Sequence, residues 1–168
     1  HNPTVGIALP ARDEQRAIDE GRDIDIDDGP QAMSTKELNA FLLCCPTEWK
    51  LYFRFLAATG VRVSESFAFR WKDLQLDGSS PHVRVRRALV RGRFGPPKSK
   101  YGRRVIPLGN DVVMALRAHR KTCQYCSDDH LVFPAQNGEP LRQENVRRRV
   151  LKPTAEEAGV PWVAFHSF

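Results

Sequence analysis

One octet of the sequence, residues 58–65, has the residue types and spacing of a site for a phosphate group. Gly60 can end one helix in a left-handed cap, so that the next helix begins at once. Arg62 would then project from a first helical turn, beside unpaired backbone N–H groups that favour an anion. Glu65 can accept the spare donors of the guanidinium and orient it for a bidentate contact with two phosphate oxygens. The alternative is an ordinary surface ion pair at i,i+3, which contributes little to stability.

A basic block covers residues 82–104, with nine lysines and arginines and no acidic residue. A strand pair that only faces water would normally mix both signs of charge. The alternation in residues 82–86 predicts a strand that buries its two valines and exposes its arginines. Each phosphate that such a surface neutralises releases counterions and adds affinity for nucleic acid. We expect DNA contacts from this block and from a second basic cluster at residues 147–149, through Arg84, Arg86, Arg91, Arg93, Lys100, Arg103, Arg147 and Arg148.

The four cysteines stand as two pairs, at residues 44–45 and at Cys123 and Cys126. Adjacent cysteines in a helical pattern argue against a disulfide framework and fit reduced, cytoplasmic thiols. Cys123 and Cys126 form a CxxC that could begin a zinc site. The sequence has only one such pair, however, whereas a structural zinc site has four ligands. We therefore expect no metal, and a zinc-stabilised module remains a minor alternative.

The elements that must position these residues are mostly helical. Ser34 and Glu37 form a capping-box pattern before an apolar helix face. Apolar periodicity, with Gly, Pro and an N-cap at Asp111 as boundaries, predicts helices at about residues 34–45, 47–60, 62–69, 111–119, 144–151 and 154–158. Residues 82–86 and 103–108 alternate as two paired strands. The sequence thus predicts a mainly α domain with a small antiparallel β-sheet, an α+β architecture, inserted after the third helix.

Charge is unevenly distributed along the chain. Residues 11–28 carry eight acidic side chains against three arginines, although the whole chain carries a net charge of +6. Sparse apolar residues, with several Gly and Pro, make residues 1–30 an expected interdomain linker. Residues 31–168 are then the expected folded domain. No apolar run approaches the length of a membrane span. Since the chain lacks an initiator methionine and stops at Phe168, we expect it to be a fragment.

Taken together, these motifs resemble the catalytic domain of the tyrosine recombinase (phage integrase) family. The first arginine motif, the hairpin whose turn carries a lysine, a short apolar landmark and the opening of a His-x-x-Arg motif occur in family order and at family spacing. They stand at residues 56–65 and 69–74, 97–100 and 103–108, 131–134, and 165–168. The resemblance covers about residues 31–168 and implies an incomplete version of that domain's fold.

The resemblance also implies a reaction and roles for named residues. Members cut DNA by attack of a tyrosine on a backbone phosphate, which gives a 3′-phosphotyrosine and a free 5′-hydroxyl, without metal, ATP or other cofactor. Arg62 would be the first arginine that clamps the phosphate, and Glu65 would support it. Lys98 would be the general acid, with Lys100 as its rival. His166 would hydrogen-bond the phosphate or assist proton transfer.

Other parts of the family's site are expected beyond Phe168, namely the second arginine, a second histidine or tryptophan, and the nucleophilic tyrosine. Tyr52, Tyr101 and Tyr125 are expected to be structural. The chain alone should therefore bind DNA weakly and cleave nothing. The whole protein would act in the cytoplasm on double-stranded DNA, as a homotetramer on paired sites and without a membrane. The alternative function is a non-catalytic basic DNA- or RNA-binding module on the same scaffold.

Overall fold

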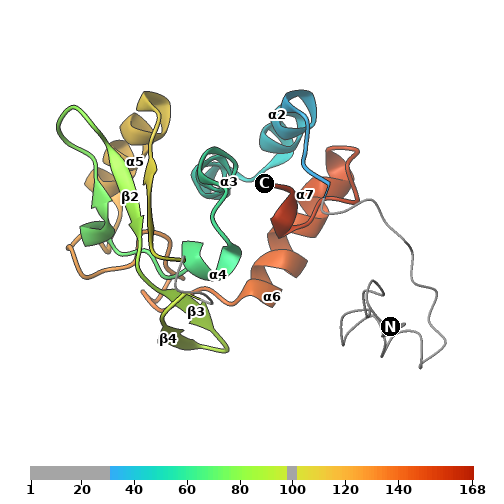
Figure 1. The fold of residues 1–168 in the computed structure, drawn as a ribbon. Helices are drawn as coiled ribbons and strands as arrows, with labels where there is room; N and C mark the ends of the chain where they lie inside the picture. Colours follow the sequence, from blue (N-terminus) through green and yellow to red (C-terminus); the bar gives the residue numbers. More distant parts are fainter. Residues whose placement is uncertain (1–30, 98–101) are drawn as a thin grey trace, which may run out of the picture. The chain divides into compact units, whose positions relative to one another are not determined.

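The computed structural model of the chain describes residues 31–97 and 102–168, so the predicted linker at residues 1–30 lies outside the described residues. Within the unit Ala32–Phe168, helix α3 (Thr47–Thr59) contacts both α5 (Asn110–Thr122) and α2 (Thr35–Cys44). Figure 1 shows strand β2 (His82–Val85) on the α5 side of α3 and helix α7 (Lys152–Glu157) on the α2 side. The prediction of a mainly helical domain with small antiparallel sheets is confirmed.

The first two helices begin and end where the sequence predicts. Ser34 caps α2, because its Oγ accepts the Glu37 backbone N–H at 3.3 Å while its own N–H donates to Glu37 Oε2 at 2.8 Å. Helix α3 ends at Gly60, which has φ 58° and ψ 25° and donates its N–H to the Leu56 carbonyl at 2.9 Å. A side chain is strained in this left-handed conformation. Glycine therefore fixes the point at which the chain leaves α3.

The third helix is shorter than predicted, because α4 covers only Val63–Ser66. After a turn, the chain pairs with a segment that is distant in sequence. The Val132 N–H donates to the Phe69 carbonyl at 3.0 Å, and Arg70 forms an antiparallel bridge with Leu131. These bonds satisfy backbone groups that a longer helix would have used. The apolar side chains of residues 131–133 are buried.

The main sheet is antiparallel and has three strands, in the order β1 (Leu74–Gln75), β2 (His82–Val85) and β5 (Arg104–Pro107). Strand β2 pairs with β5 over its whole length, with Arg84 opposite Val105. Val83 and Val85 are buried and Arg84 is exposed, so the predicted alternation is confirmed. The short strand β1 is not among the predicted elements. Nor is the hairpin of β3 (Ala88–Val90) and β4 (Arg93–Gly95), which forms a second sheet.

The predicted cap of α5 is wrong. Its N-cap is Gly109, and Asp111 lies in the first turn of the helix. There the Asp111 carboxylate pairs with Arg54 of α3, with 3.1 Å between Oδ2 and Nη2. The side chain that could cap the helix instead forms an ion pair with the neighbouring helix.

The last two predicted helices form one continuous helical run. It consists of α6 (Gln143–Val146), a π-helical stretch η3 (Arg147–Leu151) and α7 (Lys152–Glu157). Pro153 stands in the first turn of α7. Proline has no N–H to donate and its ring crowds the carbonyl four residues before it. The preceding turn is therefore widened to π-helical spacing, and the run is not interrupted as predicted.

Aromatic side chains dominate the core between the helices. Tyr52, Phe53 and Phe55 of α3 are no more than 1% exposed. Phe41 of α2 meets Phe53 edge-to-face with 5.0 Å between ring centroids, a favourable arrangement of two aromatic quadrupoles. In the parts of the chain that the structure describes, none of the helices is long and apolar enough to cross a membrane.

Candidate active site

Arg62 is presented to solvent by the turn between α3 and α4. It is the N-cap of α4, with φ −64° and ψ 146°, and not a member of the first helical turn as predicted. Val61 and the extended Arg62 separate the left-handed Gly60 from the helix. The Arg62 side chain is 61% exposed. The guanidinium can therefore reach a ligand outside the protein while its backbone is fixed by the helix.

Glu65 holds both the backbone and the side chain of Arg62. Its side chain is only 1% exposed. The backbone N–H of Arg62 donates to Glu65 Oε2 at 3.1 Å, and Nη1 of Arg62 reaches Oε1 at 3.5 Å. The predicted pairing of these two residues is thus present, although the guanidinium contact is long. The main ion pair of Glu65 is with another residue.

Arg104 of β5 is the residue that the sequence reasoning missed. Its Nη2 donates to Glu65 Oε2 at 2.9 Å and its Nη1 to Oε1 at 3.1 Å, a bidentate pair across 39 positions of sequence. Nη1 also donates to the Gly102 carbonyl at 3.2 Å. The basic block at residues 82–104, which contains no acidic residue, is the sequence signal for such a partner, because a buried carboxylate needs a cation. That signal did not indicate which of nine basic side chains would approach Glu65.

The charges of this cluster favour an anionic ligand. One buried carboxylate lies between two guanidiniums, so the cluster keeps one net positive charge. Because Arg104 satisfies both oxygens of Glu65, most donors of Arg62 remain available to another acceptor. An arginine presented in this way can bind two oxygens of one phosphate.

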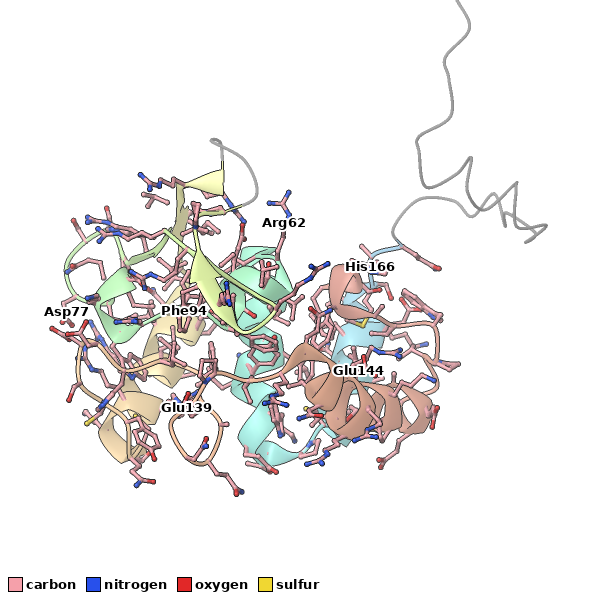
Figure 2. All side chains as sticks on the ribbon, turned by 90° about the horizontal axis from the view of Figure 1, so that it is seen from below. Arg62, Asp77, Phe94, Glu139, Glu144 and His166 are labelled. Carbon is pink, nitrogen blue, oxygen red and sulfur yellow. The ribbon has the colours of Figure 1, made fainter. Side chains whose placement is uncertain are left out.

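His166 lies on a short 3-10 turn, η4 (Phe165–Ser167), and is exposed. Its neighbours hold the turn in place. Phe165 meets Phe67, the residue that follows α4, at 6.4 Å between ring centroids, and Phe168 packs on Phe41 and Phe53 at 5.3 and 5.1 Å. In Figure 2, Arg62 and His166 both lie along the same edge of the folded unit. The structure thus presents both predicted residues toward one side.

The segment that carries Lys98 and Lys100 lies outside the described residues. The residues at its two ends are described and are buried. A β-carbon on Gly102 would lie 2.3 Å from Cβ of Pro97, so only glycine permits this approach. Gly102 also accepts the hydrogen bond from Arg104. The two ends of the segment are therefore packed against one another, next to the Glu65 cluster.

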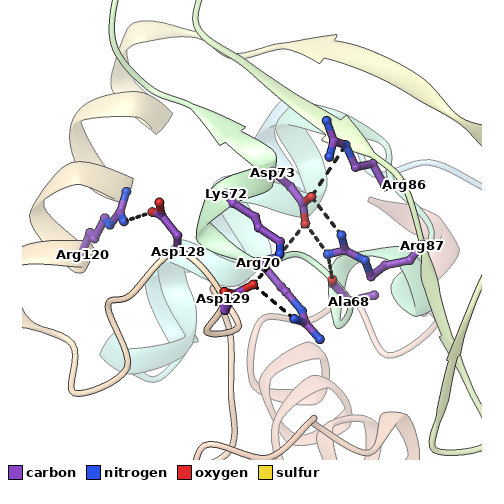
Figure 3. Close-up of polar contacts among 9 residues, drawn as sticks. All are labelled: Ala68, Arg70, Lys72, Asp73, Arg86, Arg87, Arg120, Asp128 and Asp129. Atoms are coloured by element: carbon purple, nitrogen blue, oxygen red, sulfur yellow. Dashed lines mark hydrogen bonds and ion pairs between the residues drawn. The ribbon is translucent and has the colours of Figure 1, made fainter.

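A second buried carboxylate, Asp73, neutralises part of the basic block (Figure 3). Its side chain is 1% exposed and accepts Arg87 Nη1 at 2.6 Å and Nη2 at 3.3 Å. The Arg70 backbone N–H donates to the same group at 2.9 Å. Arg86, which was expected at the DNA, lies 4.0 Å from Asp73 and is half exposed. Arg87 therefore has a structural role, and Arg86 is partly neutralised.

The other arginines expected at the DNA differ in whether they already have a partner within the protein. Arg84 donates from Nε to His82 at 3.2 Å, and Arg147 donates to Glu144 at 3.2 Å. Four more of the expected arginines are exposed, and no carboxylate of residues 31–97 or 102–168 lies within ion-pair distance of them. They are Arg91, Arg93, Arg103 and Arg148.

The side chains of Tyr52 and Tyr125 make contacts within the fold. Tyr52 is buried, its hydroxyl lies 3.0 Å from Ser66 Oγ, and burial raises its pKa above the ordinary value. The Tyr125 hydroxyl donates to the Gln136 carbonyl at 3.4 Å. Tyr101 lies outside the described residues. No group of three His, Cys, Asp or Glu side chains within residues 31–97 and 102–168 could hold a metal, so nothing there supports the zinc alternative.

Comparison with known proteins agrees with this geometry. The model of the phage integrase family matches residues 31–168. The chain belongs to the phage integrase family. The resemblance inferred from the motifs is thereby confirmed.

Relatives and solved structures of the same family share parts of the chain. Tyrosine recombinase XerC of Xanthomonas axonopodis pv. citri (strain 306) is 33% identical over 116 residues, which is 66% of this chain and 33% of that protein. The chain thus spans about a third of the length of this curated relative. The Tn1549 transposon integrase bound to transposon right end DNA shares the fold with a TM-score of 0.65 and 20% identity, over 86% of this chain and 52% of that one. XerA recombinase shares it at 0.59 and 21%, over 84% and 48%.

Proposed function

We propose that this phage integrase family chain is part of the DNA-cleaving domain of a site-specific recombinase. The enzyme would cut one DNA strand through a 3′-phosphotyrosine and rejoin it to another end. The observation that carries the proposal is the buried Glu65 carboxylate, paired with Arg104, beside an Arg62 whose guanidinium is exposed. This arrangement orients a cation toward an external anion, as phosphoryl transfer requires.

Double-stranded DNA is the proposed substrate. The Tn1549 integrase and XerH recombinase structures that share this fold are described as complexes with transposon DNA and with a difH substrate. The exposed arginines of the basic block and of η3 would contact the DNA backbone and so give salt-dependent affinity. Assembly as a homotetramer on paired sites, and action in the cytoplasm, belong to the same proposal.

The proposed reaction assigns a step to each residue. A tyrosine of the whole protein, and not Tyr52, Tyr101 or Tyr125, loses its hydroxyl proton to His166 or to water as its oxygen forms the bond to phosphorus, and the bond from phosphorus to the 5′-oxygen breaks. Arg62 stabilises the charge on the non-bridging oxygens, and His166 donates a hydrogen bond to the same phosphate or assists proton transfer. The leaving 5′-oxygen takes its proton from Lys98, with Lys100 as the alternative donor. Glu65 takes no part in proton transfer and only positions Arg62.

Trapping of the covalent intermediate tests the proposal. The protein from the complete reading frame is incubated with nicked duplexes from which the cleaved piece diffuses away, and adducts that survive detergent are counted. Arg62→Ala should slow adduct formation at least about a hundredfold and leave DNA binding largely intact. Arg54→Ala is the matched control, because this arginine pairs with Asp111 away from the site and its loss should not change the rate.

Two outcomes would contradict the proposal. Normal adduct formation by the Arg62→Ala variant would remove Arg62 from the reaction. DNA binding without any adduct from the wild-type protein would favour the non-catalytic binding module. Lys98→Ala and Lys100→Ala, made singly, identify the acid by which of them slows cleavage.

A further inference from the structure

The hairpin of β3 and β4 is mounted rigidly at its base. Just before β3, Arg87 is held by the buried carboxylate of Asp73, and Ala88 at the start of β3 is itself buried. On β4, the Phe94 ring lies 5.7 Å from the guanidinium carbon of Arg70, a cation–π contact. Strand β3 also packs against α4, the helix that Arg62 caps. The hairpin therefore has a fixed position beside the proposed phosphate site.

The two faces of the hairpin differ in character. Leu89 is opposite Phe94, and Val90 is opposite Arg93. Since neighbouring residues of a strand point to opposite faces, the first pair lies on the face of Arg70, where Leu89 packs on the core and Phe94 stays 42% exposed, and the second pair lies on the other face. Val90 is 58% exposed and Arg93 is also exposed. The outer face thus presents an apolar side chain directly beside an arginine.

The turn at the tip is made by Arg91 and Gly92, with φ of 51° and 75°. Two positive φ values indicate a type I′ turn, whose first position favours Asn, Asp or Gly. A β-carbon with positive φ is strained, so an arginine at this position does not serve the turn. Its side chain is exposed, and no carboxylate of the described residues forms an ion pair with it. Its position at the tip places the cation farthest from the hairpin's base.

We propose that this hairpin enters the major groove of DNA and reads base pairs near the cleaved phosphate. Arg91 or Arg93 would donate two hydrogen bonds to a guanine, and Val90 would contact a thymine methyl. The inference rests on the proposed function and adds to it a source of sequence preference. The major groove is wide enough for a two-stranded ribbon, and only there does thymine present its methyl group.

Pure phosphate binding explains less of the structure. It needs cations alone and gives no use for an exposed valine beside Arg93. It also needs no rigid mounting, since flexible basic chains neutralise phosphates as well. A minor-groove contact would leave the valine without a methyl partner, because that groove shows mainly A·T-versus-G·C differences.

Selection of bound duplexes from a random pool tests the inference on the protein from the complete reading frame. Arg91→Ala or Arg93→Ala should erase the preference at one or two positions, with a loss of about 5- to 100-fold in affinity for the wild-type selected site. Val90→Ser should weaken the preference for a neighbouring thymine. The control is Arg148→Ala, which should weaken all sequences alike and reduce the slope of log affinity against log salt by about one.

Base analogues identify the groove. In the selected site, 7-deazaguanine removes the major-groove N7 acceptor, uracil removes the thymine methyl, and inosine removes the minor-groove amino group of guanine. We expect the first two to weaken wild-type binding and to have no further effect on the matching hairpin variant. Sensitivity to inosine alone would overturn the major-groove assignment.

An unchanged preference in all three hairpin variants would overturn the inference but leave the proposed function standing, provided that adducts still form. If the wild-type protein neither binds DNA nor forms adducts, the proposed function itself is refuted.

Discussion

Replacement of Arg104 by alanine is the sharpest test of how this site is held together. The change leaves the Glu65 carboxylate buried and without its bidentate partner. Breaking a buried ion pair costs roughly 3–5 kcal/mol, and a hydrogen bond to a charged group contributes roughly 1.5–3 kcal/mol. The Arg104 side chain is 33% exposed, so water can enter and replace part of the loss. We expect a decrease of about 2–3 kcal/mol in the free energy of unfolding.

Thermal unfolding, followed by circular dichroism, measures this loss. For a domain of this size each kcal/mol corresponds to about 3–5 °C, so the melting temperature should fall by about 6–15 °C. Arg104→Lys keeps the charge but not the bidentate geometry and should recover only part of it. Arg103→Ala is the matched control, since this exposed neighbour makes no ion pair within the described residues. It should change the melting temperature very little.

A double-mutant cycle with Glu65→Gln isolates the pair. Once the carboxylate is gone, loss of Arg104 leaves no buried charge, so the second substitution should cost less than half of what it costs alone. An equal cost of Arg104→Ala in both backgrounds, or a decrease below about 2 °C in the wild-type background, would refute the assigned role of Arg104.

Two further predictions concern the boundaries of the helices. Hydrogen bonds from the side chain and backbone of Ser34 lower the pKa of Glu37 below its ordinary 4.5. A lowered pKa stabilises the fold above pH 4.5 and loses this effect as the pH falls through the folded value. The difference in melting temperature between wild type and Glu37→Gln should therefore be present at pH 7 and decrease as the pH falls below 4.5. Gly60→Ala meets no atom within 4 Å but keeps φ near 58°, so the backbone strain should cost about 1–2 kcal/mol, measurable by thermal unfolding.

The sequence predicts those features that depend on a few neighbouring residues. The capping box of Ser34 and Glu37, the end of α3 at Gly60, and the buried valines of β2 are all local signals, and all are confirmed. Helix α4 is too short for its local pattern because Phe69 pairs with Val132, a contact between segments far apart in sequence.

The missed parts of the site also depend on distant contacts. Arg104 meets Glu65 only because the register of β2 and β5 places it there, and composition alone cannot choose it from nine basic residues. The hairpin of β3 and β4 was hidden because its turn begins with Arg91, a residue that seldom occupies this position. The signal that indicates it is the two three-residue segments that flank Arg91 and Gly92 and can pair as strands.

Because Pro97 packs closely on Gly102, the segment between them can vary in sequence without a change in the stability of the fold. The segment between them carries both candidate acids, yet its ends are joined by packing, and the strand that follows is tied to Glu65 through Arg104. A surface segment whose two ends are fixed by packing can change in length and sequence at little cost to the fold. On the proposed assignment of Lys98 or Lys100 as the acid, the residue that delivers the proton could be changed while the scaffold stays the same. On the same assignment, an exchange of this segment alone would change the cleavage rate and leave the fold intact.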